Sequence, residues 1–318
     1  MRKLAEYLDA ATRENTRQSY QGAVRHYEIE WGGFLPATAD SVARYLTNYA
    51  GSLSINTLRH RLAALAQWHI EQGFPDPTKA PVVRKVFRGI QALHPQQEKR
   101  ARPLQLDHLE QAVRTLDAAS ASSAEQGDRA SELRHIRNKA LLLIGFWRGF
   151  RGDELTRMRI EDITVVPNEG ISFYFPQTKG DRQYRGTTFR APALSRLCPV
   201  DAYLTWISAS QLNDGPVFRA IDRWGHIGST GLHPDSLVTL LRSILANAEI
   251  PSANLYSVHS LRRGFANWAT SNGWDIKTLM EYVGWKDANS AMRYIDAADP
   301  FARHRIESAL LMPITDDR

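Results

Sequence analysis

The chain has a single cysteine, Cys198, among its 318 residues. One thiol excludes an intrachain disulfide and any cysteine-rich metal site, and it is typical of a reducing compartment. Long apolar runs are also missing, because the longest, residues 140–147, is too short to span a bilayer. The first residues lack the apolar core of a signal peptide. We therefore expect a cytoplasmic protein without a membrane partner.

Acidic residues are fewer than basic ones. The chain carries 40 Lys and Arg against 34 Asp and Glu, a formal net charge of +6 and a pI near 9.5. This excess favours a polyanionic partner, although charge alone does not separate DNA from RNA or from an anionic membrane. The length exceeds the usual size of one core, so we expect two domains.

The first domain is predicted at residues 1–94 and is helical by periodicity. Tyr20, Val24, Tyr27 and Trp31 share one helical face, and further apolar stripes follow within residues 42–49, 58–65 and 80–91. Thr38 is a suitable N-cap for the second helix. No strand pattern interrupts these segments.

A basic linker is predicted at residues 95–104, within the stretch "HPQQEKRARPLQ" (residues 94–105), which has two prolines and no apolar periodicity. The nineteen residues from Arg84 to Arg102 contain one acid, Glu98. A solvated face explains such a run, but the linker beside it favours phosphate binding. The candidate phosphate-binding residues are Arg59, Arg84, Lys85, Arg88, Lys99, Arg100 and Arg102.

The second domain is predicted at residues 105–318. Its pattern predicts a helix at 106–116, a mobile loop of small residues at 117–132 and a strong helix at 136–147. Alternating residues on both sides of a Gly-Asp turn predict two antiparallel strands, and helices are expected from Pro199 to the end. The fold class is therefore mainly α with a small antiparallel β-sheet, as a helical domain followed by a mixed α/β domain.

Two basic motifs stand in the first part of this domain. In "GFRGDEL", Arg151 begins a helical turn and Glu154 follows one turn later, so the carboxylate can orient the guanidinium. Such a pair is usually a surface ion pair. In "QTKGDRQYRG", Lys179 lies on the hairpin, where a lysine is usually just solvated.

Two further motifs lie near the end of the chain. In "HSLRR", His259 and Arg262 are three residues apart, so they share one helical face. A metal pair is not indicated, since an arginine does not coordinate metals. Trp285 and, nine residues later, Tyr294 follow in "VGWKDANSAMRYID".

The order and spacing of these motifs resemble those of the tyrosine recombinases, the phage integrase family. "GFRGDEL" is similar to the family's first arginine box, "TKG" to its hairpin lysine, "HSLRRGFA" to its His-x-x-Arg box and "AMRYID" to its tyrosine box. The resemblance covers the whole chain, with the first four helices similar to the family's core-binding domain and the second domain to its catalytic domain.

The resemblance implies that Tyr294 is a nucleophile that forms a covalent 3′-phosphotyrosyl link. Arg151 and Arg262 would stabilise the phosphate, which suits planar and permanently charged donors. Lys179 would protonate the leaving 5′ oxygen, and His259 would manage the proton of Tyr294. Glu154 would support them. No metal and no cofactor is implied.

Three positions depart from the family pattern. Trp285 stands where most members have histidine, although an indole N–H donates to the same phosphate oxygen. Arg263 stands where histidine or lysine is frequent, and Ala291 where threonine is common. We still expect activity, because no charge-stabilising donor is lost.

The expected partners are double-stranded DNA and further copies of the chain, as a dimer on a full site and a tetramer in synapsis. The tail "DPFARHRIESALLMPITDDR" has an apolar stripe that would join protomers. Two alternatives stay open: a type IB topoisomerase that relaxes DNA, and a DNA-binding accessory protein with a vestigial pocket.

Overall fold

A computed structural model of the chain describes residue 7 and residues 14–95, 100–178 and 185–295. The chain divides into two compact units, residues 1–99 and residues 100–318. Within the described ranges, no helix combines the length and the apolarity needed to cross a membrane. The predicted fold class, mainly α with a small antiparallel sheet, is confirmed.

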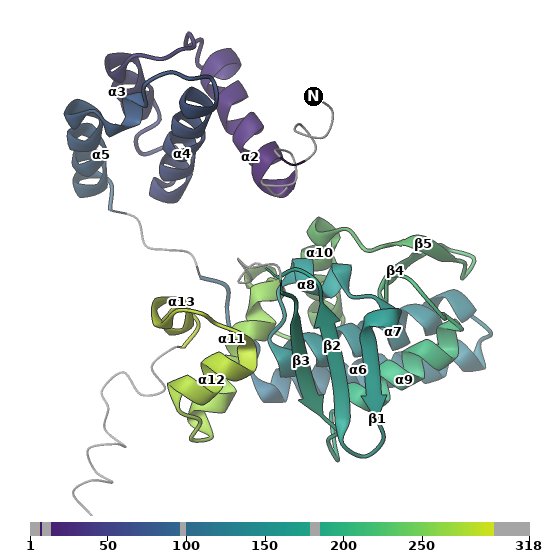
Figure 1. Cartoon of the computed structure of the whole chain (residues 1–318). Helices are drawn as coiled ribbons and strands as arrows, with labels where there is room; N and C mark the ends of the chain where they lie inside the picture. The colour runs from purple at the N-terminus through teal and green to yellow at the C-terminus, as the bar shows by residue number, and fades with distance from the viewer. Residues whose placement is uncertain (1–6, 8–13, 96–99, 179–184, 296–318) are drawn as a thin grey trace, which may run out of the picture. The chain divides into compact units, whose positions relative to one another are not determined.

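The first unit is built of α-helices (Figure 1). The described helices are α2 (Glu14–Arg25), continued by a π-helical turn (His26–Glu30), α3 (Ala39–Asn48), α4 (Ile55–Glu71) and α5 (Pro81–Leu93). Serine and threonine caps begin two of them: Thr38 accepts a hydrogen bond from the Ser41 N–H, and Ser54 accepts one from the Thr57 N–H. The predicted N-cap at Thr38 is confirmed.

Aromatic side chains hold the centre of the first unit. Tyr27 and Tyr45 are fully buried, and their ring centroids lie 5.1 Å apart in an edge-to-face arrangement. Leu58 on α4 and Val83 on α5 complete this core. The core positions fall on the apolar stripes that the sequence predicts, so α5 is left with an exposed basic face.

The second unit combines helices with two small sheets. Its helices are α6 (Leu106–Glu125), α7 (Arg129–Arg148), α8 (Gly152–Arg157), α9 (Pro199–Ser210), α10 (Pro234–Asn247), α11 (Val258–Ser271), α12 (Ile276–Val283) and α13 (Ala288–Met292). Its strands are β1 (Ile163–Val166), β2 (Gly170–Phe175), β3 (Thr187–Pro192), β4 (Arg219–Ile221) and β5 (Ile227–Gly231).

Helix α7 is the central element of this unit, because it packs against α6, α9 and α11 (Figure 1). Its side chains from Ala140 to Phe146 are buried almost all round. The antiparallel sheet β1-β2-β3 places Phe173 opposite Phe189, and both rings pack edge-to-face on Phe150 just beyond the helix. The sheet is thereby fixed against the end of α7.

Two sequence predictions for the second unit are wrong. The segment predicted as a mobile loop, residues 117–132, continues α6 to Glu125 and then begins α7, with Asp128 as its N-cap. Its alanines favour a helix, and the predicted loop underrated that propensity. Helices do not run uninterrupted from Pro199, because β4 and β5 form a hairpin. Strands this short carry almost no periodic signal.

The chain just before α6 is attached to α11. The Leu104 N–H donates to the Ser260 carbonyl, and the Leu104 side chain is fully buried. The approach is close, since a Cβ on Gly264 would lie 2.0 Å from the Leu104 carbonyl oxygen. The last part of the segment predicted as a linker is therefore packed on the second unit, and Gly264 makes room for it.

Candidate active site

Helix α11 carries two of the predicted site residues. Ser257 and Ser260 begin this helix, and the Ser257 N–H donates to the Ser260 hydroxyl at 2.9 Å. His259 lies in the first turn and is exposed, whereas Arg262 lies one turn later and is 1% exposed. Their spacing places both on one side of the helix, as predicted.

Arg262 is fixed by the end of α7. Its Nη1 donates to the Gly149 carbonyl at 2.5 Å. Gly149 ends α7 with a φ of +57°, a conformation that glycine adopts without strain, and its carbonyl lies at the negative end of the helix dipole. One edge of the guanidinium is therefore held by backbone.

The other donors of Arg262 have no acceptor among the described residues. The Nε and Nη2 atoms of Arg262 are buried and make no hydrogen bond to any described residue, and the same holds for Nε1 of Trp285. The Arg262 guanidinium carbon lies 4.8 Å from the Trp285 ring. Buried donors without acceptors are costly, so this cluster is suited to an anionic ligand.

Arg262 keeps its charge at neutral pH. Burial, followed by the charge of the nearby Arg151 guanidinium, lowers the pKa of Arg262 to about 9, while Glu154 acts in the opposite direction. A pKa of about 9 leaves the side chain protonated at pH 7. Arg151 and Arg262 together carry two positive charges against the one negative charge of Glu154, so the site has a net positive charge.

Arg151 is oriented by Glu154, which confirms the predicted geometry of this pair. The Glu154 carboxylate accepts from the Arg151 N–H at 2.8 Å and from Arg151 Nη1 at 2.7 Å. Glu154 is 2% exposed, so its two oxygens are committed to this role. Arg151 stands at the start of α8 and remains partly exposed, with its side chain at 24%. A charge-assisted pair of this kind fixes one guanidinium edge.

Tyr294 lies beside these groups. Its ring is stacked on Trp285, with centroids 5.3 Å apart, and the Arg262 guanidinium carbon lies 5.4 Å from the centre of the Tyr294 ring. Its hydroxyl is 3.3 Å from Nδ1 of His259. The fold therefore brings the phenol, an imidazole and two guanidinium groups to one place.

Lys179 and the tail lie outside the described residues, and so does Lys99. The strands that lead to Lys179, β2 and β3, form the predicted hairpin. The predicted residues that the structure brings together are Arg151, Glu154, His259, Arg262, Trp285 and Tyr294.

The sequence did not reveal the role of Arg148, a buried residue that connects the elements around the site. Arg148 is 2% exposed and donates through Nη1 to the Arg190 carbonyl at 3.0 Å and through Nη2 to the Tyr282 carbonyl. Its guanidinium also lies 3.9 Å from the Tyr282 ring centre. It thus joins α7 to β3 and to the end of α12, just before Trp285. The signal was its place in the buried stripe of α7, seven residues after Leu141.

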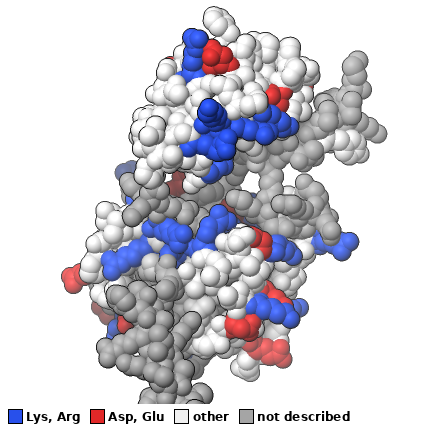
Figure 2. Space-filling model, turned by 90° about the vertical axis from the view of Figure 1, so that its left-hand side faces the viewer, with Lys and Arg blue, Asp and Glu red and all other residues white. Residues whose placement is uncertain are grey.

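The remaining predicted DNA contacts are exposed cations. Arg59 on α4 and the three cations of α5 (Arg84, Lys85 and Arg88) lie on the first unit, and Arg59 sits over the Phe87 ring at 5.7 Å. Figure 2 looks onto the side that bears α5 and shows Lys and Arg side chains gathered there. In the second unit, Arg100 and Arg102 are also on the surface, and Arg102 lies over the Tyr256 ring.

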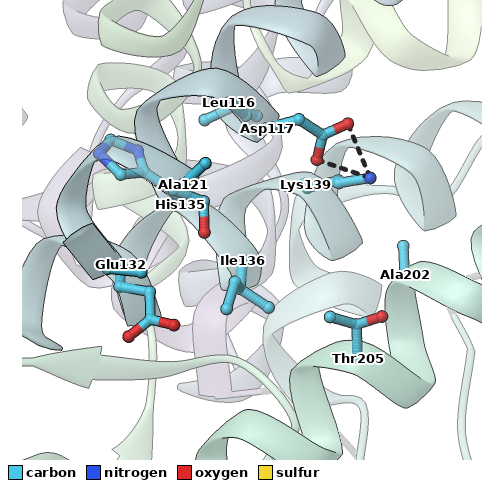
Figure 3. A pocket seen from close by; sticks show the side chains of 11 residues that line it. Leu116, Asp117, Ala121, Glu132, His135, Ile136, Lys139, Ala202 and Thr205 are labelled. Carbon is cyan, nitrogen blue, oxygen red and sulfur yellow. Dashed lines mark hydrogen bonds and ion pairs between the residues drawn. The ribbon is translucent and has the colours of Figure 1, made fainter.

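The surface cavity between α6, α7 and α9 is a separate feature. It has a volume of about 310 Å³ and is lined by Lys139, Asp117 and small residues such as Ala121 (Figure 3). Lys139 and Asp117 neutralise each other in an ion pair at 2.7 Å. None of the predicted site residues lines this cavity, so it is distinct from the cluster around Arg262.

Two curated proteins of similar sequence are recombinases by name. The chain is 26% identical over 307 residues to an integrase/recombinase xerD homolog of Selenomonas ruminantium, covering 92% of this chain and 86% of that protein. It is 26% identical over 282 residues to recombinase cre of Escherichia phage P1, covering 84% and 78%.

Solved structures share the fold. The Tn1549 transposon integrase in complex with transposon right end DNA matches with a TM-score of 0.61 and 14% identity over 94% of both chains. A lambda integrase dimer bound to a COC′ core site matches with a TM-score of 0.56 and 14% identity over 91% of both chains. The model of the phage integrase family matches residues 109–300, which hold all the clustered site residues. This chain is therefore a member of the phage integrase family, the tyrosine recombinases.

Proposed function

We propose that this protein is a site-specific DNA recombinase that cuts and rejoins strands through a covalent 3′-phosphotyrosyl intermediate at Tyr294. The observation that carries the proposal is the buried Arg262, with two donors that lack an acceptor among the described residues and lie beside Trp285 and the Tyr294 ring. A DNA phosphate supplies the acceptors that these donors lack. Family membership supports strand cleavage and rejoining in general.

The arginines act on the charge of the transition state. When an oxygen attacks phosphorus, negative charge develops on the nonbridging oxygens, and preorganised donors in a dry site stabilise it. Arg262 is held on Gly149, and Arg151 is held on Glu154, so neither needs to reorganise during the reaction. Trp285 adds a neutral N–H donor.

The covalent step exchanges one P–O bond for another. The Tyr294 oxygen attacks phosphorus and loses its proton to His259, whose Nδ1 lies 3.3 Å away. The P–O5′ bond breaks as the P–O bond to tyrosine forms, and the leaving 5′ oxygen takes a proton. By resemblance to the family, Lys179 donates that proton. Attack by a 5′ hydroxyl on the phosphotyrosine reverses the step and rejoins the strand.

Covalent capture of nicked DNA tests this proposal. A duplex pool with a nick placed so that the cleaved fragment diffuses away should convert the protein to a slower-migrating adduct in a denaturing gel. The adduct should form equally in EDTA, because the proposed donors are all side chains. Strict dependence of cleavage on a divalent ion would overturn the mechanism.

Plasmid relaxation and two-site exchange assays, run beside covalent capture, separate the alternatives. Relaxation of supercoiled plasmid without exchange between two sites would indicate a type IB topoisomerase. Binding without any adduct would indicate an accessory protein with a vestigial pocket. Exchange of flanking DNA between two sites supports the recombinase.

We further propose that the basic side chains of the predicted set bind DNA phosphates: Arg59, Arg84, Lys85, Arg88, Lys99, Arg100 and Arg102. The binding constant for DNA falls as the salt concentration rises. Replacing the three cations of α5 by glutamine should make the plot of log binding constant against log salt concentration less steep by up to about three, since each lost phosphate contact removes about one from the slope. The control is Arg44→Gln on α3, because Arg44 already pairs with Asp40 at 2.9 Å. An unchanged slope in the triple variant, measured by fluorescence anisotropy, would remove α5 from the interface.

We also propose that protomers assemble on DNA, as a dimer on a full site and a tetramer when two sites are brought together. The lambda integrase neighbour is a dimer bound to a core site. Recombination joins strands of two duplexes, so it needs more than one active site in one complex. The tail that would join the protomers lies outside the described residues.

A further inference from the structure

Arg263 connects helix α11 to the backbone of the tyrosine segment. It is 5% exposed, and its Nη1 donates to the Arg293 carbonyl at 2.8 Å. Arg293 follows the last residue of α13 and directly precedes Tyr294. The hydrogen bond therefore ends on the peptide group through which the chain enters Tyr294.

The Arg293 carbonyl lies at the end of helix α13. The last carbonyls of a helix have no partner within the helix, and a nearby arginine is suited to bind them. Helix α13 has only five residues, so it has little regular structure of its own to hold the chain. The Tyr294 N–H donates to the Ala291 carbonyl at 2.9 Å. Arg263 thus adds a fixed point from another helix.

Three residues on one face of α11 lie close to Tyr294 or bind the residue before it. His259, Arg262 and Arg263 are spaced so that the second and third lie three and four residues after the first, and their side chains leave the helix on the same side. His259 lies 3.3 Å from the hydroxyl, Arg262 lies 5.4 Å from the ring centre, and Arg263 binds the backbone. The helix that holds the phosphate site therefore also sets the position of the tyrosine.

We propose that Arg263 is a positioning residue that fixes Tyr294 for attack on the phosphate. This inference rests on the proposed function, in which Tyr294 is the nucleophile. Attack requires the phenol oxygen about 3–3.5 Å from phosphorus and in line with the leaving oxygen, and a displacement of about 1 Å costs on the order of 10²-fold in rate. Arg263 acts through the backbone of Arg293 and does not touch DNA in this scheme.

Arg263→Met tests the inference, because methionine keeps an apolar stem and removes the donors. The variant should form adduct with nicked DNA about 10²-fold more slowly than the wild type. Binding of a single half-site should stay within about twofold. Arg263→Lys, which retains one charged donor, should recover at least about a tenth of the wild-type rate, a rescue that a purely packing role does not predict.

A small nucleophile shows whether Arg263 acts through the tyrosine. In a Tyr294→Phe background, hydroperoxide anion can attack phosphorus directly, forming the new P–O bond while the P–O5′ bond breaks and the 5′ oxygen takes a proton. Peroxide cleavage should be equal, within about twofold, whether this background keeps Arg263 or also carries Arg263→Met. Equal losses in the tyrosine and peroxide reactions would overturn the positioning role and place Arg263 in the phosphate pocket.

Arg137→Met is the matched control for the loss of a buried arginine. Arg137 is also 5% exposed and also donates to a backbone carbonyl at 2.8 Å, that of Arg219. Arg137→Met should form adduct at the wild-type rate. If its rate falls as much as that of Arg263→Met, the effect of Arg263→Met is due to general destabilisation. If Arg263→Met does not fold, Arg263→Gln replaces it in both reactions.

The outcomes separate this inference from the proposed function. Wild-type rates in both Arg263→Met and Arg263→Gln would overturn the positioning role while leaving Tyr294 as the nucleophile. An adduct formed by Tyr294→Phe would overturn the nucleophile, and the role of Arg263 with it.

Discussion

Replacing Tyr294 by phenylalanine is expected to abolish covalent capture of nicked DNA while leaving half-site binding within about twofold. The change removes one oxygen, which in the proposed mechanism is the only protein atom that bonds to phosphorus. The ring would remain stacked on Trp285 and next to Arg262, because those contacts involve the ring faces. The lost hydrogen bond to His259 is long, at 3.3 Å, and exposed, so the fold should be almost unaffected.

Tyr256→Phe is the control for this experiment. The Tyr256 hydroxyl also lies near Nδ1 of a histidine, His108, at 3.4 Å. It is buried in the same unit, so the substitution removes a comparable hydroxyl without touching the cluster. This variant should form adduct at the wild-type rate. An adduct that persists in Tyr294→Phe, detected in a denaturing gel and located by peptide mass spectrometry, would assign the reaction to another side chain.

The geometry within single helices could be predicted from the sequence. His259 and Arg262 share a face because the helix repeats every 3.6 residues, and Glu154 reaches Arg151 because the two stand one turn apart. The sequence also indicated the hairpin around Lys179. These relations join residues that are close in the sequence, so they follow from the secondary structure alone and can be predicted without the tertiary structure.

Relations through the backbone could not be predicted. Arg262 is fixed by the Gly149 carbonyl, and Arg263 binds the Arg293 carbonyl. Every residue has a carbonyl, so no residue type marks the acceptor, and the partner is chosen by tertiary packing. The same reason hid Arg148, whose acceptors are the carbonyls of Arg190 and Tyr282.

The errors in the secondary structure have a similar cause. The stretch from Asp117 to Glu125 lacks large apolar residues, so the hydrophobic pattern predicted a loop, yet its alanines continue α6. The hairpin of β4 and β5 is held partly by α7, because Arg134 donates to the Asp222 carbonyl at 2.5 Å. Short strands that depend on such contacts show no period of their own.

Replacing Arg262 by alanine is expected to slow adduct formation by about 10²–10³-fold or more, the usual cost of removing one preorganised charge-stabilising donor. Arg262 is expected to be more sensitive than surface cations because it is buried and charged, with two donors that have no acceptor among the described residues. Those donors are in place before DNA binds, so their loss affects the transition state and not the orientation of a mobile side chain.

Arg262→Lys separates charge from geometry at this position. Lysine keeps a positive charge, but its single ammonium cannot bind the Gly149 carbonyl on one edge while presenting a planar pair of donors on the other. We therefore expect cleavage by Arg262→Lys to be faster than by Arg262→Ala and still at least about tenfold slower than by the wild type, measured as the single-turnover rate on nicked DNA with saturating protein. Half-site binding and thermal unfolding of each variant show whether the fold is intact. Near wild-type cleavage by Arg262→Ala would mean that the phosphate is bound elsewhere, because the proposed binding site depends on the buried Arg262 donors beside Tyr294.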